Sequence, residues 1–502
     1  MKRPMKRLYP IIPLIEERAA RDQVPHRADA PTSEALGYPG ELVEDWQARA
    51  IERLGERVAG SRALRVFMDS CTRCGACTDK CHYFLGTHDP NNMPVARQEL
   101  LRAVWRRYHT WSGRWFPWLV GARDLTRERL DDWYRYFHQC SECRRCAVFC
   151  PQGIDTSEVS MAGRDILATV GLGQRYGQTI VEKAGRLGNN LGLKRPALAD
   201  VLESLEEDIL EETGVAVRLP LDRTGCEILV VTPSADFFAE PHVDGLIGYA
   251  KVLHAAGVSW TFSSHASEAA NFGLFAGNLE QERQLAERLM TAVITLGVSR
   301  LVIGECGHAW RVAGARLPAL VGDLSMLAKG RAEHLCELTV ELLQAGRIRL
   351  DPARNAGVVA TYHDSCNVAR GAMMGERADG AFELPRRLLR AAVPEFVEMA
   401  ESSTRRQTFC CGGGGGLLSD ELLPLRVQGA EPRARALRSV VDERAVTHLV
   451  AICAICKTQF GSVLPAHQLG QVQVTSLHAL VGDALVLAVP PGDPDRHEAP
   501  VT

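Results

Sequence analysis

The pattern of apolar and polar positions changes near residue 224 of this chain. Beyond it, short β-rich apolar runs alternate with segments of helical periodicity, which is typical of α/β layers. Strands are predicted at 227–232, 300–304, 357–361 and 448–452, and a helix at 285–296. The preceding stretch, 173–223, is polar and helix-prone, and we interpret it as a linker.

The two halves of this α/β region look alike. Superposing the second predicted strand of each half places Glu305 opposite Cys453 and His308 opposite Cys456. This indicates an internal duplication whose first copy has lost its cysteines.

Length and charge limit the possible functions. The 502 residues suffice for about three domains, and 46% hydrophobic and 24% charged residues are ordinary for a soluble globular protein. Lys+Arg 58 against Asp+Glu 61 gives a net charge of −3, so we expect no nucleic-acid partner. No apolar run is long enough to span a bilayer, and we expect a cytoplasmic protein with an extended N-terminal arm.

Sixteen cysteines indicate a reducing compartment and metal binding. Two runs have the spacing C-x2-C-x2-C-x3-C, in which three thiolates bind one cubane [4Fe-4S] cluster and the fourth binds the other cluster. Structural zinc would use two separated pairs instead. We assign one cluster to Cys71, Cys74, Cys77 and Cys150, and the other to Cys140, Cys143, Cys146 and Cys81.

A third group of cysteines lies in the second α/β half. It comprises Cys366, Cys410, Cys411, Cys453 and Cys456. Five thiolates are one more than a cubane or a zinc site needs, which implies an unusual cluster. The glycines at 412–416 let backbone N–H groups approach sulfur, and no Lys-Ser/Thr follows them to make a phosphate-binding loop.

These motifs resemble a known family. The C…CCG…CxxC arrangement is similar to the cysteine-rich (CCG) domain of heterodisulfide reductases, and two ferredoxin motifs before it look like the HdrD-type fusion. The stretches CTRCGACTDKCHYF, CSECRRCAVFCPQGID, GECGHAWR and FCCGGGGGLL resemble DsrK-type subunits of the DsrMKJOP membrane complex. The resemblance implies that the third group holds one noncubane [4Fe-4S] cluster that cleaves a sulfur–sulfur bond.

The resemblance also implies the partners. It names a haem-containing integral membrane subunit of the DsrM type as electron donor and a DsrC-like sulfur-carrier protein as substrate. We therefore expect the chain to lie peripherally on the inner face of the cell membrane, attached through its partner subunits.

The expected fold class is α+β multidomain, with an α-helical di-cluster ferredoxin-like domain before a pseudo-duplicated α/β CCG domain. The expected segments are an N-terminal arm (1–60), the ferredoxin-like domain with an inserted helical segment (61–172), a helical linker (173–223), a degenerate first CCG half (224–345), a complete second half (346–490) and a polar tail (491–502).

Two residues of the first half are candidate catalytic residues. Cys306 lies at the carboxyl end of a predicted strand, where open α/β sheets place their sites. We predict that Cys306 contacts the substrate sulfur and that His308 delivers a proton. The alternative is that both are remnants packed in the interface between the halves. The lone Cys226 and Cys336 are assigned no role.

The segment 82–139 between the ferredoxin motifs is rich in tryptophan and arginine. One interpretation is a docking surface for a partner subunit or a membrane interface. The other is an inserted helical hairpin that packs its rings inward. Its tryptophans are Trp105, Trp111, Trp115, Trp118 and Trp133.

The sequence thus predicts an oxidoreductase in which two cubane clusters carry electrons to a noncubane cluster that reduces, or reversibly oxidises, a disulfide or trisulfide. Two alternatives remain: an iron–sulfur subunit of a glycolate- or lactate-type dehydrogenase, and a non-catalytic subunit that only conducts electrons.

Overall fold

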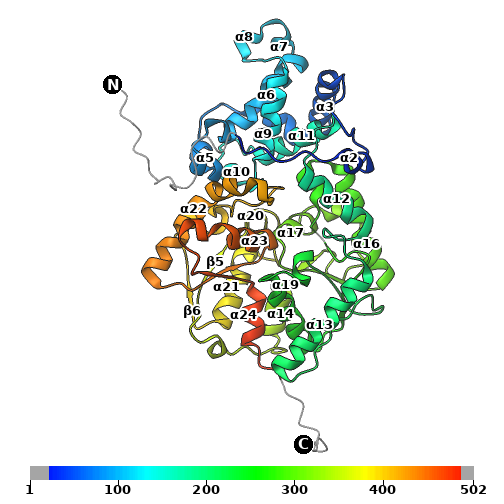
Figure 1. The fold of residues 1–502 in the computed structure, drawn as a ribbon, viewed down its shortest axis with the longest axis vertical. Helices are drawn as coiled ribbons and strands as arrows, with labels where there is room; N and C mark the ends of the chain where they lie inside the picture. Colours follow the sequence, from blue (N-terminus) through cyan, green and yellow to red (C-terminus); the bar gives the residue numbers. More distant parts are fainter. Residues whose placement is uncertain (1–21, 269, 488–502) are drawn as a thin grey trace, which may run out of the picture.

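An α-helical domain lies above an α/β domain when the long axis is vertical (Figure 1). The structure is a computed structural model that describes residues 22–268 and 270–487. The expected tail at 491–502 and the first part of the expected arm lie outside the described residues. The upper domain comprises α2 (Ala30–Ala35), α3 (Trp46–Gly60), α4 (Arg62–Ser70), α5 (His82–Thr87), α6 (Pro94–His109), α7 (Trp111–Trp115), α8 (Pro117–Val120), α9 (Arg127–His138), α10 (Arg145–Val148) and α11 (Thr156–Thr169).

The later part of the segment expected to be an arm is folded. Ala50, Leu54 and Val58 recur at four-residue spacing on α3 and are buried in the core of the α-helical domain. α3 packs against α11, which also contacts α6 and α9. Helix α3, at the end of the segment expected to be an arm, therefore belongs to the ferredoxin-like domain.

Two helices, α12 (Arg175–Leu187) and α13 (Arg195–Thr213), connect the domains. The first α/β half contains β1 (Ile228–Val231), α14 (His242–Ala255), β2 (Trp260–Thr261), α15 (Phe272–Ala276), α16 (Leu279–Leu296), β3 (Arg300–Ile303), α17 (Gly307–Ala313), α18 (Leu317–Val321), β4 (Glu333–His334) and α19 (Leu335–Gln344). The second contains β5 (Val359–His363), α20 (Cys366–Ala369), α21 (Gly380–Ala392), β6 (Glu395–Val397), α22 (Leu423–Arg444), β7 (His448–Ala451), α23 (Ala454–Val463), β8 (Gln473–Thr475) and α24 (Leu477–Ala484).

The two sheets share one topology. Their strand orders are β2-β1-β3-β4 and β6-β5-β7-β8, and every neighbouring pair is parallel. In the first sheet Leu229 pairs with Leu301, and in the second Thr361 pairs with Leu449, so the equivalence of Leu301 and Leu449 holds in the register. Because these parallel strands are buried on both faces, the strand segments are continuous runs of apolar residues.

Reciprocal helix contacts join the two halves. α14 packs against α24, and α21 packs against α19. In each pair, the first long helix after the first strand of one half meets the last helix of the other half. This reciprocity is the pattern of a pseudo-twofold axis and supports the duplication.

The duplication places specific residues of the first half at ligand positions of the second. Ser234 follows Ile228 of β1 by six positions, as Cys366 follows its counterpart Ala360 of β5 by six. Ser234 therefore occupies the position of Cys366.

The loop after β3 corrects the superposition expected from the sequence. Cys306 is the N-cap of α17 and Cys453 is the N-cap of α23, so these two cysteines are equivalent. The first half has one more residue between strand and helix, which shifts the alignment beyond the strand by one. Glu305 instead lies at the interface between the halves, where its carboxylate is 2.7 Å from Nδ1 of the buried His478.

Among the helices of the described residues, none combines the length and the apolar character needed to cross a bilayer.

Candidate functional site

The thiols of the first expected cubane share one small cavity. Cys71, Cys74 and Cys77 line it from the loop after α4, and Cys150 lines it from the second motif. The loop curls around the cavity because Arg73 and Gly75 adopt left-handed backbone conformations, with φ of 57° and 80°. The structure thus brings Cys150 of the second motif beside the three thiols of the first motif.

Three thiols of the second expected cubane, those of Cys81, Cys140 and Cys146, lie near the buried guanidinium of Arg97. Its Nη1 lies 3.5 Å from Sγ of Cys81, and its charge also acts on Cys140 and Cys146. Although burial opposes the effect, Arg97 holds the pKa of the Cys81 thiol below its usual range. Arg97 therefore compensates for the negative charge that thiolates place in this interior.

The five cysteines of the third group form one buried cluster of sulfur atoms. Sγ of Cys366 lies 3.8 Å from Sγ of Cys410. Hydrogen bonds with Cys143, Cys366 and Cys411 hold the pKa of the Cys410 thiol well below its usual range. Cys411 in turn interacts with Cys456, and Cys456 with Cys453. The sequence-predicted set is thus brought together, Cys366 included.

The glycine run supplies backbone donors to this sulfur cluster. The N–H of Gly412 lies 3.4 Å from Sγ of Cys410. The hydrogen bond with Cys410 and burial raise the pKa of the Cys411 thiol well above its usual range, and the N–H of Gly413 opposes that shift. Gly412 and Gly415 have φ of 98° and 65°, which only glycine adopts without strain. A run without side chains lets N–H groups reach sulfur from this side.

The three groups of thiols suit iron–sulfur clusters. Among the described residues, no three His, Cys, Asp or Glu side chains converge on one ion position. Thiols spread around a shared space suit a cluster, in which each thiolate binds a different iron.

The second ferredoxin motif and the third group are neighbours. Cys143 packs against the buried cysteines of the third group, and its thiol interacts with Cys410. Arg164 fixes this contact, because its guanidinium donates to the carbonyl oxygens of Cys140 and Gly415, each at 2.7 Å.

His82, which stands where the first motif would usually have proline, also binds both domains. Its Nε2 lies 2.7 Å from Oγ of Ser141, and its Nδ1 lies 2.7 Å from the carbonyl oxygen of Gly429 on α22. The neighbouring Tyr83 donates to the carbonyl oxygen of Gly412 at 2.6 Å. The departure from the motif therefore serves the packing of the two domains.

A cavity of about 420 Å³ lies beside the third group. Its walls come from the carboxyl ends of β1 and β3, from α12 and from the start of α23, the usual position of a site in an open α/β sheet. Cys306 and His308 are buried in its wall, whereas Arg175 and Leu191 at its rim are exposed. Both predicted catalytic residues therefore face one space that opens to solvent.

The geometry at Cys306 combines a structural role with access to the cavity. Its Sγ accepts a hydrogen bond from the N–H of Ala309 at 3.4 Å and caps α17. Burial, with further contributions from Cys453 and Glu268, raises the pKa of the Cys306 thiol well above its usual range. Cys306 is therefore a neutral thiol at physiological pH.

Glu268 is a site residue that the sequence did not reveal. It lines the same cavity and accepts hydrogen bonds from Ala270 N–H at 2.8 Å, Ser234 N–H at 2.6 Å and Ser234 Oγ at 2.9 Å. Burial nevertheless raises its pKa to about 7. It is a carboxyl group that can hold or release a proton near neutral pH. A lone glutamate in an irregular loop carries no sequence pattern that would have identified it.

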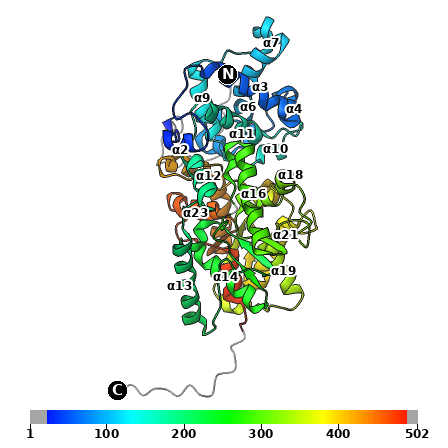
Figure 2. The same cartoon turned by 90° about the vertical axis from the view of Figure 1, so that its right-hand side faces the viewer.

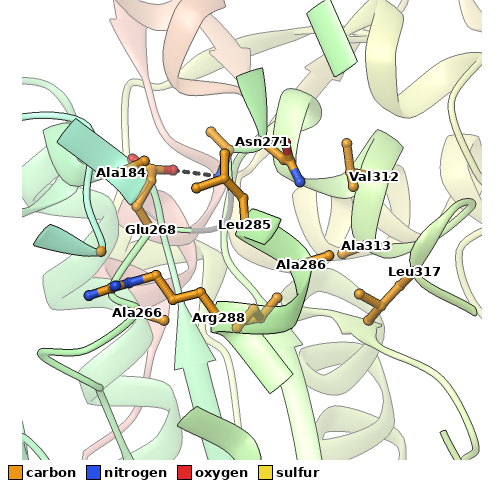
Figure 3. A pocket seen from close by; sticks show the side chains of 13 residues that line it. Ala184, Ala266, Glu268, Asn271, Leu285, Ala286, Arg288, Val312, Ala313 and Leu317 are labelled. Atoms are coloured by element: carbon orange, nitrogen blue, oxygen red, sulfur yellow. Dashed lines mark hydrogen bonds between the residues drawn. The ribbon is translucent and has the colours of Figure 1, made fainter. Parts of the chain in front are cut away.

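Behind Glu268 lies a second, smaller cavity (Figure 3). Leu285, Ala286, Val312, Ala313 and Leu317 form its largely apolar walls. With space for about 20 Å³ it holds roughly one water molecule and no substrate.

Comparison with known proteins agrees with both domains. Residues 67–154 match the 4Fe-4S dicluster domain family, and residues 360–461 match the cysteine-rich (CCG) domain family. These two ranges contain all thirteen predicted cluster ligands.

Relatives that match most of the chain extend this result. The chain is 38% identical over 478 residues to the Hdr-like menaquinol oxidoreductase iron-sulfur subunit 2 of Archaeoglobus fulgidus, covering 89% of this chain and 84% of the relative. The corresponding protein of Archaeoglobus profundus gives the same identity and coverage. The chain belongs to the Hdr-like iron–sulfur subunits.

A more distant relative supports an HdrD-like architecture for this Hdr-like subunit. The HdrD protein of the dihydromethanophenazine:CoB–CoM heterodisulfide reductase of Methanosarcina mazei is 26% identical over 66% of this chain and 75% of the relative. The Hdr-like subunit is thus an electron-transfer, HdrD-like protein of an oxidoreductase family. The comparisons name HdrD-like proteins and not DsrK.

The Trp-rich segment of the Hdr-like subunit contains both inward-packed rings and exposed rings. Trp133 is fully buried and Trp105 packs against the same core, whereas Trp111, Trp115 and Trp118 are exposed. Cys226 and Cys336 are buried among apolar side chains.

Proposed function

We propose that this Hdr-like subunit reduces a disulfide or trisulfide of a sulfur-carrier protein of the DsrC type, or runs the reverse oxidation. The observation that carries the proposal is the cavity beside Cys453. Ser234 and Cys306, the counterparts of Cys366 and Cys453, line it in place of cluster ligands. A space at the position equivalent to the third group, separated from Cys453 by the ring of His308, suits a sulfur-bearing arm.

We assign two cubane clusters to the ferredoxin motifs and one noncubane cluster to the five cysteines of the third group. When bound, these groups supply electrons one at a time and the metal centre for sulfur–sulfur cleavage. The contact of Cys143 with Cys410 supports the order in which the second cubane is next to the third group. We propose a haem-containing membrane subunit as the donor.

The chain's own residues would bind the substrate and move protons. Reducing one S–S bond consumes two electrons and two protons and yields two thiols. The neutral Cys306 thiol faces the arriving sulfur, and His308 holds Cys453 in place. Glu268 supplies one proton from the cavity wall, and solvent at the rim supplies the other and reprotonates Glu268.

The test uses cluster-loaded protein under anaerobic conditions, a chemically reduced viologen and a carrier protein whose disulfide has been formed. We expect one disulfide to be lost, and two thiols to appear, for every two viologen electrons consumed. Rapid reduction of the clusters with no thiol release would instead support a subunit that only conducts electrons. Reduction of the clusters by a flavoprotein and its hydroxy acid would support the dehydrogenase alternative.

A further inference from the structure

An exposed aromatic surface projects from the α-helical domain at α7 and α8, a segment we term the tryptophan tip (111–120). In both views α7 lies at the far end of the molecule (Figures 1 and 2). The exposed fractions are 71% for Trp111, 66% for Trp115, 75% for Trp118 and 76% for Leu119. A contiguous apolar surface of this kind marks an interaction site.

The tip is held in shape by polar groups, so the exposure of its rings is part of a defined conformation. Thr110 Oγ1 caps α7 by accepting from Gly113 N–H at 3.1 Å. A Cβ at Gly113 would lie 1.8 Å from the Arg106 carbonyl oxygen, so only glycine fits there. Arg106 also donates to the Val120 carbonyl oxygen at 2.9 Å.

The exposed rings contact one another instead of the core. The ring centroids of Trp111 and Phe116 are 5.7 Å apart, and those of Phe116 and Trp118 are 5.9 Å apart, both edge to face. The polar anchors point inward and the aromatic cluster points outward, which is the reverse of a helical hairpin that packs its rings inside.

Charge identifies the occupant of this surface. Residues 100–123 contain five arginines and no acidic residue, and the flanking Glu99 and Asp124 pair with Arg102, Arg106 and Arg107. Arg114, within the tip, and Arg123, just after it, are exposed and form no ion pair that offsets their charge among the described residues. Tryptophan and arginine together are typical of the boundary between lipid headgroups and acyl chains, and arginine is attracted to anionic headgroups. We propose that the tryptophan tip inserts into the interface of a bilayer containing anionic lipids.

Such insertion would add a direct lipid contact to attachment through partner subunits, and it places one part of the chain near the membrane. Arg73, in the loop of the first cysteine motif, donates to Glu99 of α6, and a Cβ at Gly121 would lie 3.2 Å from its Nη2. The first cubane site is therefore directly connected to the tip. This inference does not depend on the chemistry proposed at Cys306.

The test measures sedimentation of purified cluster-loaded protein with phosphatidylcholine vesicles, with or without phosphatidylglycerol. We expect binding to the anionic vesicles that weakens as salt rises. The double variant Trp115→Ser/Trp118→Ser should bind them at least tenfold more weakly, while Ile294→Ser, at an exposed apolar position of α16, should bind like the unchanged protein. Cluster absorbance and circular dichroism check that each variant is folded.

Three outcomes would overturn the proposal. The first is absence of binding to either vesicle, and the second is equal binding by the double variant. The third is loss of capture by the membrane subunit in the double variant with no vesicle binding by the unchanged protein, which would assign the tip to a protein partner. Partial recovery of vesicle binding by Trp115→Phe/Trp118→Phe would support insertion.

Discussion

Nδ1 of His308 lies 3.9 Å from Sγ of Cys453, so an imidazole of the first α/β half contacts the sulfur of a predicted cluster ligand in the second half. The N–H of Gly415 lies 3.4 Å from Nε2 of the same ring. Because Nε2 accepts that hydrogen bond, the neutral ring carries its hydrogen on Nδ1 and directs it at the Cys453 sulfur. Phe272 and Phe275 pack on the ring and fix its orientation.

The iron content distinguishes the third site from the other two. Anaerobically prepared protein should contain about twelve irons, four for each [4Fe-4S] cluster. Cys411→Ser should lose about four of them and only the noncubane paramagnetic signal, because the cubane ligands lie in another domain. Eight irons in the unchanged, intact chain would contradict a third cluster, and loss of cubane signals in the variant would contradict the separation of the sites.

Substitutions of Cys306 distinguish its role as the N-cap of α17 from its proposed contact with the substrate sulfur. Cys306→Ser keeps an oxygen that can cap α17, as serine does at many helix starts, so fold and iron content should stay normal. If the thiol contacts the substrate sulfur, carrier-dependent turnover should nevertheless fall at least tenfold, as in Cys306→Ala. Turnover within about twofold of the unchanged protein, about 0.4 kcal/mol of barrier, would reduce Cys306 to a structural residue.

The elevated pKa of Glu268 predicts the pH dependence of disulfide reduction. Since its pKa is raised to about 7, the carboxyl group is protonated below that pH and loses its proton above it. We expect kcat/KM for the carrier to decline above about pH 7, and Glu268→Gln to be slower and to lack this decline. Glu421, in the same cavity, has a lowered pKa, so Glu421→Gln should keep the decline. Persistence of the decline in Glu268→Gln would assign it to another group.

The same shift has a consequence for stability. A folded-state pKa above the ordinary carboxyl value means that the neutral form stabilises the fold at low pH, and that this contribution is lost progressively as pH rises from the ordinary carboxyl pKa to about 7. Relative to the unchanged protein, Glu268→Gln should therefore gain melting temperature above pH 7. A difference in melting temperature between Glu268→Gln and the unchanged protein that stays constant from pH 5 to pH 9 would contradict the burial of this carboxyl group.

Arg164 should be among the most sensitive positions of the domain interface. Its guanidinium donates to the buried carbonyl oxygens of Phe137, Cys140, Phe275 and Gly415. Arg164→Met removes these donors, and because each unpaired buried group costs about 1–3 kcal/mol, we expect a loss of several kcal/mol in anaerobic thermal unfolding.

A matched substitution provides the control for Arg164. Arg186 on α12 is largely exposed and forms one ion pair with Glu182, so Arg186→Met should change stability by no more than about 0.5 kcal/mol. Equal effects of the two substitutions would mean that the contacts of Arg164 do not stabilise the interface.

The sequence predicted those parts of the site that depend on spacing. Ligand exchange between the motifs follows from three thiolates on a loop and a fourth one helical turn further on, and Cys150 does line the cavity of the first motif. The equivalence of Leu301 and Leu449 was recoverable because apolar strand patterns survive duplication. The additional residue before Cys306 could not be predicted, because the length of a loop leaves no periodic pattern in the sequence.

Other features depend on tertiary contacts that no local pattern records. Glu268 acquires its raised pKa only where the chain buries it beside Ser234. Trp118 and Trp133 lie in one tryptophan-rich segment. Trp133, on α9, is nevertheless buried in the core of the α-helical domain, whereas Trp118 is exposed to solvent. The composition indicates that such rings pack against another surface, and the packing of the neighbouring helices decides whether that surface is the core or an external partner.

The contact between α5 and α22 holds the α-helical domain against the second α/β half. A Cβ at Gly86 would lie 1.8 Å from the carbonyl oxygen of Gln428, so backbone meets backbone there, and Tyr83 occupies the corresponding space above Gly429. At this contact the two domains therefore meet without a flexible side chain between their backbones. Because electron tunnelling falls steeply with distance, even a methyl group at residue 86 would wedge the domains apart and slow conduction while leaving every cluster ligand in place.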